Sequence, residues 1–175
     1  MRFFLFISII LLMSTTILFD FNKTSTIDNW NIVDDVVMGG RSSGNFEIDN
    51  NGHGKFSGDV SLENNGGFSS LRYNFETKDV SSYSRIKLRI KGDGKTYQFR
   101  VKTSNQDYAS YIYEFKTTTD WMTIDVPFEL MYPAYRGQRL RQPNFEGNQM
   151  EQIAFLIGNK KEQSFELLID KIELE

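Results

Sequence analysis

The stretch R-I-K-L-R-I-K-G-D-G-K-T-Y-Q-F-R-V-K, residues 85–102, sets the fold class of this chain. Apolar and polar side chains alternate strictly on both sides of the Gly-Asp-Gly turn at residues 92–94. A period of two residues is typical of a β-strand with one buried face and one face in water. The stretch therefore predicts two strands, at 85–91 and 97–102, which we expect to pair as a hairpin with one strongly basic face.

The basic face of this hairpin has two interpretations. Lysine and arginine on the outer surface of a sheet are usually solvated and need no further role. The alternative is a docking patch for an acidic partner or an anionic surface, which a cluster of cations attracts electrostatically. The spacing of the residues leaves both interpretations open.

Short alternating runs recur along most of the chain. Clusters of turn-forming residues, such as Asn-Asn-Gly at 50–52, separate them. Helical periodicity is missing outside the N-terminal leader. About ten antiparallel strands at short spacing predict an all-β fold, a jelly-roll β-sandwich. Besides 85–91 and 97–102, the expected strands are 17–21, 45–49, 55–62, 68–75, 111–116, 121–126, 152–157 and 165–174.

Composition excludes several classes of function. The chain has 175 residues, a length typical of one domain, and a net charge of -3, which argues against a dedicated nucleic-acid binder. It contains no cysteine, so disulfides, thiolate zinc sites and thiol nucleophiles are excluded. The single histidine, His53, lies between two glycines, and we interpret it as a solvated turn residue.

The N-terminus has the character of a targeting segment. Arg2 precedes an apolar run at 3–13, about the length of the apolar core of a secretory signal. We expect residues 1–16 to be a signal peptide, residues 17–175 to form a single domain, and the protein to be exported to the periplasm or cell envelope. The alternative is an uncleaved membrane anchor, although about 17 residues interrupted by Ser and Thr is the lower limit for spanning a bilayer.

The stretch W-N-I-V-D-D-V-V-M-G-G-R-S-S-G at 30–44 combines apolar anchors with a turn. We expect Met38 to be buried and the glycines at 39–40 to adopt backbone angles closed to other residues. One interpretation is an irregular crossover that is fixed by packing. The other is a loop that contacts a ligand or partner through its charged residues, Asp34, Asp35 and Arg41.

The segment between Val126 and Glu151 lacks strand alternation and holds all three prolines. Loops this long are usually functional or disordered. Its aromatics are interleaved with arginines, a mixture enriched at protein interfaces and also suited to stacking on sugar rings. The alternative is a loop that closes one end of a sandwich with its aromatics as plugs. The residues expected to contact a partner or ligand here are Tyr132, Tyr135, Arg136 and Arg139.

Catalysis has little support in the sequence. Asp34 and Asp35 are adjacent, and adjacent residues of an extended segment point to opposite sides, so they cannot flank one bond together. The Gly-Gly pair at 66–67 lacks the lysine and the following helix that a phosphate loop needs. We therefore expect a non-enzyme with no catalytic residues, no cofactor and no metal.

Several motifs together resemble the complex I intermediate-associated protein 30 family. The resemblance covers the chain from about Ile17 to the C-terminus. It implies a galactose-binding-like jelly roll and a non-catalytic role in assembling respiratory complex I, whose unfinished subunits would be the partners. The motifs are the run at 30–42, F-S-G at 56–58, V-S-L-E-N-N-G-G-F at 60–68, K-G-D-G at 91–94 with Tyr97, P-F at 127–128 and Y-R-G at 135–137.

Two functional hypotheses follow. The first is a chaperone-like assembly factor that masks an exposed surface of an unfinished protein partner through the aromatic and arginine residues at 126–151. The second is a carbohydrate-binding protein of the cell envelope, which both the fold and the leader permit. Fold class alone does not separate them, because one architecture hosts many functions.

Overall fold

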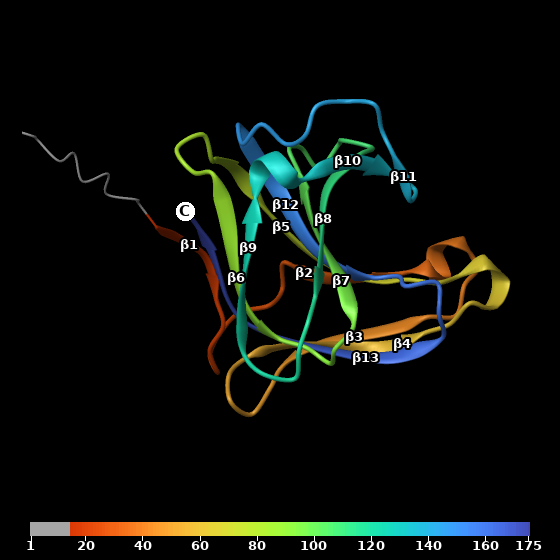
Figure 1. Ribbon diagram of the computed structural model, residues 1–175. Helices are drawn as coiled ribbons and strands as arrows, with labels where there is room; N and C mark the ends of the chain where they lie inside the picture. The colour runs from red at the N-terminus through yellow and green to blue at the C-terminus, as the bar shows by residue number, and fades with distance from the viewer. Residues whose placement is uncertain (1–14) are drawn as a thin grey trace, which may run out of the picture.

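The computed structural model describes residues 15–175, so nearly all of the expected signal peptide lies outside the described residues. Two antiparallel sheets pack face to face (Figure 1). This arrangement confirms the predicted all-β sandwich, with thirteen strands among residues 15–175 where about ten were expected. In spatial order, the first sheet contains β3 (Ser43–Ile48), β4 (Gly54–Val60), β13 (Gln163–Leu174), β6 (Arg85–Lys91) and β9 (Met122–Pro127), and β1 (Thr16–Asp20) also pairs with β13.

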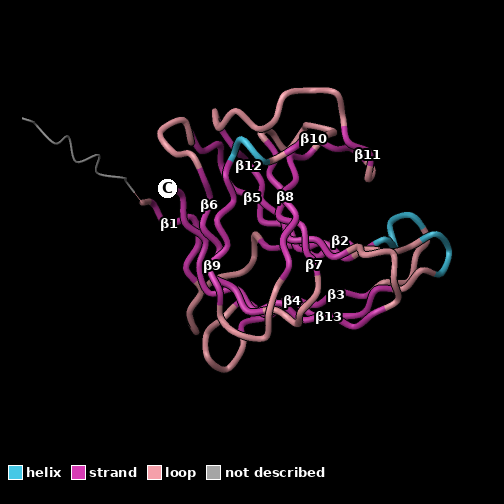
Figure 2. Tube along the Cα trace, viewed as in Figure 1, coloured by secondary structure: helices cyan, strands magenta, loops and turns pink. Residues whose placement is uncertain are grey.

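The second sheet has seven strands and positions the candidate site. In spatial order these are β11 (Gln138–Arg139), β10 (Tyr132–Tyr135), β8 (Ser110–Lys116), β7 (Thr96–Lys102), β12 (Gln149–Ile157), β5 (Ser69–Asp79) and β2 (Trp30–Asp34). Three short 3-10 turns complete the structure: η1 (Asp35–Met38), η2 (Glu63–Asn65) and η3 (Phe128–Leu130). Figure 2 shows η1 and η2 side by side at one end of the molecule, with η3 between β9 and β10.

The core lies between the two sheets and follows from the alternation of each strand. On β7, Tyr97, Phe99 and Val101 are fully buried in the core, and the intervening polar residues face outward. The ring of Phe99 packs edge-to-face on Phe155 of β12, with 5.2 Å between the ring centroids. Six residues in a row at the end of β12, 152–157, are buried, on its outer face as well as on its core face.

The hairpin predicted at 85–102 does not form. β6 pairs with β13 and β9 in one sheet, whereas β7 pairs with β12 and β8 in the other. The turn at 92–95 carries the chain across the core, and both strands still bury their apolar faces there, from opposite sides. The predicted basic face is therefore divided between the outer surfaces of two sheets.

The segment at 126–151 is more regular than its sequence indicates. β10 joins the sheet by pairing with β8, and it turns into β11 through Arg136 and Gly137. These two residues have φ angles of 47° and 76°, the left-handed region that a two-residue type I′ hairpin requires. The aromatic and arginine side chains of this segment consequently stand on a β-hairpin.

Asp35 fixes the turn that follows β2. Its buried carboxylate accepts hydrogen bonds from the backbone N–H and hydroxyl of Ser42 at 2.9 and 2.5 Å, and from the N–H groups of Gly67 and Phe68 at 2.5 and 3.1 Å. Burial alone would raise the pKa of Asp35, but these hydrogen bonds outweigh burial and hold the pKa below its usual value of 3.8. One carboxylate thus joins η1 to the β4–β5 connection.

The surroundings of Asp35 correct two expectations about the stretch 30–44. Met38 is 62% exposed, because the turn is anchored by Asp35 and not by an apolar plug. Gly39 has the expected positive φ of 92°, whereas Gly40 does not. Gly40 is required for space, since a Cβ there would lie 2.3 Å from the Asp35 carboxylate.

Asp35→Asn should lower the free energy of unfolding by about 3 kcal/mol, because an amide leaves some of the buried donors unpaired. The wild-type contribution is present above the unfolded-state pKa and is lost as pH falls through the lower folded-state pKa. The variant should therefore lose less stability than the wild type as the pH falls below about 4. Urea unfolding measures both effects. Asp34→Asn is the matched control, because Asp34 accepts one hydrogen bond, from the Gly44 N–H, and equal losses in the two variants would contradict this account.

Met38→Asp should change the free energy of unfolding by less than about 0.5 kcal/mol, because an exposed position tolerates a charge. Leu71→Asp is the comparison, since Leu71 is fully buried on β5. That change should destabilise the protein by several kcal/mol, as an unpaired buried charge does. Thermal melts separate the two, and similar losses would mean that Met38 belongs to the core.

Candidate functional site

The outer face of the seven-stranded sheet is hollowed into a cleft of about 940 Å³. Its floor includes one row of residues that crosses five strands. Residues opposite each other in antiparallel strands point to the same face. The pairing register therefore places the whole row on the cleft side: Arg72, Ala154, Arg100, Ile112 and Tyr132.

Two walls rise from this floor. The first is the β10–β11 hairpin with Tyr135, whose ring meets Tyr108 edge-on at 5.3 Å between centroids. The second is formed by η1 and the β4–β5 connection, with Val37, Met38 and Leu62 exposed toward the cleft at 74%, 62% and 41%. In Figure 2, η1 and η2 lie below β11 at the right of the view. We call these the hairpin wall and the aliphatic wall.

The cleft is strongly cationic. Arg72, Arg100, Lys102, Arg136 and Lys160 line it, against the single carboxylate of Glu114. The Nε and Nη2 atoms of Arg100 donate to the Gln98 side-chain oxygen at 3.0 and 2.5 Å. Burial, with a further contribution from the charge of Arg72, lowers the pKa of Arg100 to about 10. Burial also lowers the pKa values of Arg72 and Lys102.

The structure brings together the residues predicted at 126–151. Tyr132, Tyr135 and Arg136 line the cleft. Arg139 lies beside them, with its guanidinium carbon 4.8 Å from the centre of the Tyr132 ring, and Arg136 lies 5.3 Å from the centre of Tyr135. Cation–π contacts of this kind fix the orientation of arginine and leave its N–H groups available. Their contact with a partner stays a prediction.

The other three predicted residues do not line the cleft. Asp34 accepts the Gly44 N–H at 2.9 Å, and Arg41 forms an exposed ion pair with Glu63 at 2.9 Å. Asp35 is buried with its carboxylate already saturated by donors, so it supports the aliphatic wall and cannot touch a ligand directly. Contacts of Asp34 and Arg41 with a partner stay predictions.

The cationic residues of the cleft floor were not predicted as site residues from the sequence. The alternation of 97–102 places Arg100 and Lys102 outward, and a docking patch was one of the two interpretations of that face. The contribution of Arg72 depends on which strands are neighbours, and no local pattern contains that information. Val37 and Met38 were missed for a different reason, since an exposed apolar pair resembles a buried one in sequence.

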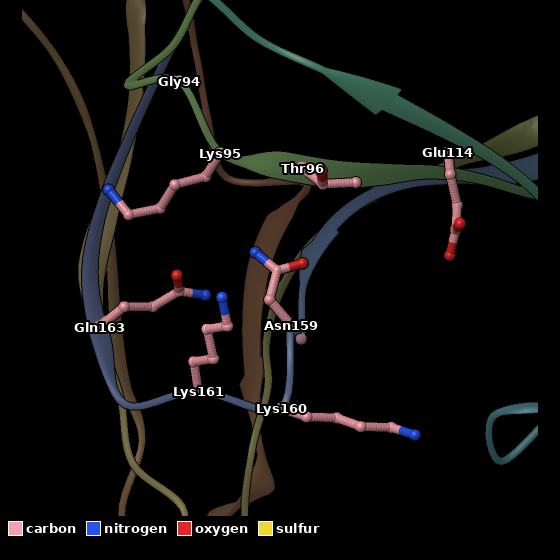
Figure 3. Close-up of a pocket in the computed structure, with 9 residues that line it drawn as sticks. Gly94, Lys95, Thr96, Glu114, Asn159, Lys160, Lys161 and Gln163 are labelled. Atoms are coloured by element: carbon pink, nitrogen blue, oxygen red, sulfur yellow. The ribbon is translucent and has the colours of Figure 1, made fainter.

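A second, shallower depression of about 510 Å³ adjoins the cleft near the β6–β7 turn and the β12–β13 connection (Figure 3). Glu114 and Lys160 line both hollows. The Lys95 ammonium there pairs with Asp93 at 2.7 Å. Figure 3 shows Lys160 and Lys161 pointing in different directions, so they do not converge on one point. We interpret this depression as a polar extension of the cleft.

Within 15–175, no helix has the length and apolar character needed to cross a membrane. In the same part of the chain, no group of three or more His, Cys, Asp or Glu side chains is placed to hold a metal ion.

Comparison with protein families identifies the chain. The model of the family described as complex I intermediate-associated protein 30 matches residues 19–169. The chain belongs to this family. A curated relative in the family is complex I intermediate-associated protein 30, mitochondrial, of Drosophila melanogaster, 24% identical over 186 residues that cover 92% of the chain. The chain spans 63% of the length of that relative. Because this relative is mitochondrial, the expectation of export to the periplasm or cell envelope is wrong.

Solved structures show how widely this fold is used. The family 11 carbohydrate-binding module of a cellulosomal cellulase from Clostridium thermocellum superposes with a TM-score of 0.66 at 19% identity, covering 93% of this chain and 94% of the module. The agarase AgWH50C gives a TM-score of 0.62 at 10% identity, covering 92% of this chain and 24% of the agarase. At such identities the likeness shows a shared fold and carries no ligand from one protein to the other.

Arg72→Met should raise the free energy of unfolding by about 0.5 to 1 kcal/mol, because an unpaired cation is replaced by an apolar side chain of similar length. Arg41→Met is the control, since Arg41 is an exposed, ion-paired arginine and should give a change near zero. Chemical denaturation of the two variants measures the difference. A clear loss of stability in Arg72→Met would mean that the Arg72 side chain stabilises the fold, which would contradict a role for Arg72 in ligand binding alone.

Proposed function

We propose that this protein is a non-catalytic assembly factor that holds a segment of an unfinished protein in its cleft, and that its partner is an intermediate of respiratory complex I. Family membership supports the kind of partner. The cleft supports the mode of action, because it offers a large surface with exposed anchors on two facing walls. The aliphatic wall is the observation that carries the proposal.

The aliphatic wall has the composition of a protein-binding surface. Val37, Met38 and Leu62 are 74%, 62% and 41% exposed, and Val36 beside them is 59% exposed. Exposed apolar side chains that cluster beside polar ones mark interaction sites, and methionine adapts its shape to different partners. On the hairpin wall, Tyr108 and Tyr135 add large contact areas at low entropy cost. A segment between the walls would cover apolar surface on both sides.

The chemistry of the cleft supports binding without catalysis. Glu114 is the one carboxylate among the lining residues, and the lining contains no histidine. The Glu114 carboxylate accepts a hydrogen bond from Gln98 at 2.7 Å. Nucleophilic catalysis needs a general base beside the nucleophile, and the lining residues include no Ser–His, Cys–His or paired-carboxylate arrangement. The titratable neighbour of Glu114 is Tyr132, and burial together with the charge of Glu114 raises the pKa of Tyr132, which disfavours its phenolate.

Carbohydrate binding is the second candidate function. The cleft contains three tyrosines, Tyr108, Tyr132 and Tyr135, whose rings could stack on sugars. Gln98 and Gln152 add amide groups that hydrogen-bond to hydroxyls. The aliphatic wall argues for protein, because branched aliphatic side chains offer no flat face to a sugar ring.

Affinity purification from a host that contains complex I tests the proposal. The wild type should co-purify with complex I subunits, and Val37→Asp/Met38→Asp and Tyr135→Ala/Arg136→Ala should each lose them. The second pair should weaken binding by about 2 kcal/mol or more if its side chains are hot spots. Glu47→Ala is the control, because Glu47 lies on β3, in the other sheet.

Two results would contradict the proposal. These are the absence of complex I subunits from the wild-type sample and their retention by both wall variants. Displacement of the bound material by soluble oligosaccharides would favour the carbohydrate hypothesis instead. Melting curves of each variant show whether a loss of binding reflects a loss of folding.

A further inference from the structure

We infer that Arg72 and Arg100 bind the carboxylate of an aspartate or glutamate side chain, carried by an extended and otherwise apolar segment of the partner protein. This inference rests on the proposed function and adds the chemistry of the bound segment. It follows from the spacing of the two arginines, from the absence of a salt bridge to either of them within residues 15–175, and from the nature of the two walls.

The sheet register spaces the two arginines around one small residue. Arg72 on β5 and Arg100 on β7 both stand opposite Ala154 of β12. Adjacent strands lie about 4.8 Å apart, so the two Cα atoms are about 10 Å apart on the same face. Ala154 also lines the cleft and places only a methyl group between them. Two long guanidinium side chains that flank such a small residue can both donate to one carboxylate.

The two guanidinium groups have no carboxylate of their own. Among residues 15–175, neither arginine forms a salt bridge, and the one hydrogen-bond acceptor that Arg100 has is the Gln98 side-chain oxygen. Burial lowers the pKa of both arginines, and the charge of Arg72 lowers the pKa of Arg100 further, partly offset by the charge of Glu114. A carboxylate placed between them would offset the repulsion, and arginine favours such an anion because its N–H groups match carboxylate geometry.

The dimensions of the floor fit a short extended segment. The row from Arg72 to Tyr132 crosses four strand spacings, or about 19 Å, which about six extended residues span. The aliphatic wall lies at the β5 end of this row and the hairpin wall at the β10 end. The fit therefore predicts an acidic residue nearer the aliphatic wall, with apolar residues on both sides.

The walls favour a polypeptide over an acidic polysaccharide. A uronate polymer would satisfy the arginines but would bring hydroxylated rings against Val37 and Met38. Apolar side chains of a peptide would be stabilised there by removing that apolar surface from water. Binding of an acidic polysaccharide is therefore the result, in the test below, that would overturn the peptide assignment.

Selection of a phage-displayed library of random dodecapeptides tests the inference. Targets are the wild type, Arg72→Gln/Arg100→Gln, and the charge-matched control Lys55→Gln/Lys171→Gln, whose lysines lie on strands of the other sheet. The wild type and the control should enrich peptides with one Asp or Glu between apolar residues. The arginine variant should keep the apolar preference and lose the acidic one.

A selected peptide then gives a double-mutant cycle by calorimetry. It should bind the wild type about tenfold or more tightly than the arginine variant, and its own Glu→Gln or Asp→Gln analogue should show no such difference. Added salt should weaken the binding of the acidic peptide more than the binding of the analogue. Selected peptides without an acidic residue, or equal binding to both proteins, would overturn the inference.

Two further measurements separate this inference from the proposed function. If oligogalacturonate binds in an Arg72- and Arg100-dependent manner and no peptide is selected, the peptide assignment is wrong and an acidic glycan replaces it. If complex I subunits co-purify equally with the wild type and the arginine variant, carboxylate recognition is wrong while the assembly role stands. Absence of those subunits from the wild type would overturn the assembly role, and the peptide cycle would still decide the carboxylate question.

Discussion

The buried carboxylate of Asp35 is the interaction on which the cleft depends. Its hydrogen bonds join η1 to Ser42, Gly67 and Phe68, residues up to 33 positions away in the sequence. Two short turns with no core of their own are thereby held as one unit. That support allows Val37 and Met38 to remain exposed, because their position does not depend on their own burial. A wall that projects apolar side chains into water needs such an internal anchor.

The sandwich supplies the second requirement, a rigid floor. β12 lies between β5 and β7, and its core face buries Ile153 and Phe155. Its opposite face supplies Ala154, between the two arginines. Like charges at this distance destabilise the fold, and a strongly packed core offsets that cost. The cationic floor therefore lowers the stability of the fold, and its charges would contribute to binding an acidic ligand.

Much of the fold could be predicted from the sequence because strand alternation is local. Ile86, Leu88 and Ile90 identify a half-buried strand whatever its neighbours are. Its partner could not be predicted, since a hairpin and a crossover to the facing sheet bury the same side chains. Pro133 and the irregular pattern around it likewise hid a strand, because β10 is four residues long and ends in a tight turn.

The candidate site was predictable to a smaller extent. The aromatic and arginine side chains at 132–139 indicated the hairpin wall from composition alone. The floor depends on pairing across three strands, and Arg72 and Arg100 are 28 positions apart with different local patterns. Asp35 was predicted to contact a ligand or partner because it is an acidic residue in a turn. In the structure, its carboxylate accepts four hydrogen bonds from residues distant in the sequence, so its role is structural.

The central claim is that both walls hold the same segment of one protein, and photo-crosslinking in the living host tests this most directly. A photoreactive amino acid would replace Met38 in one variant, Tyr135 in a second and Glu47 in a control, and crosslinked peptides would be mapped by mass spectrometry. The account predicts that Met38 and Tyr135 capture neighbouring residues of one complex I subunit, and that Glu47 captures none of them. Capture of unrelated proteins by the two walls, or of the same subunit from Glu47, would contradict it.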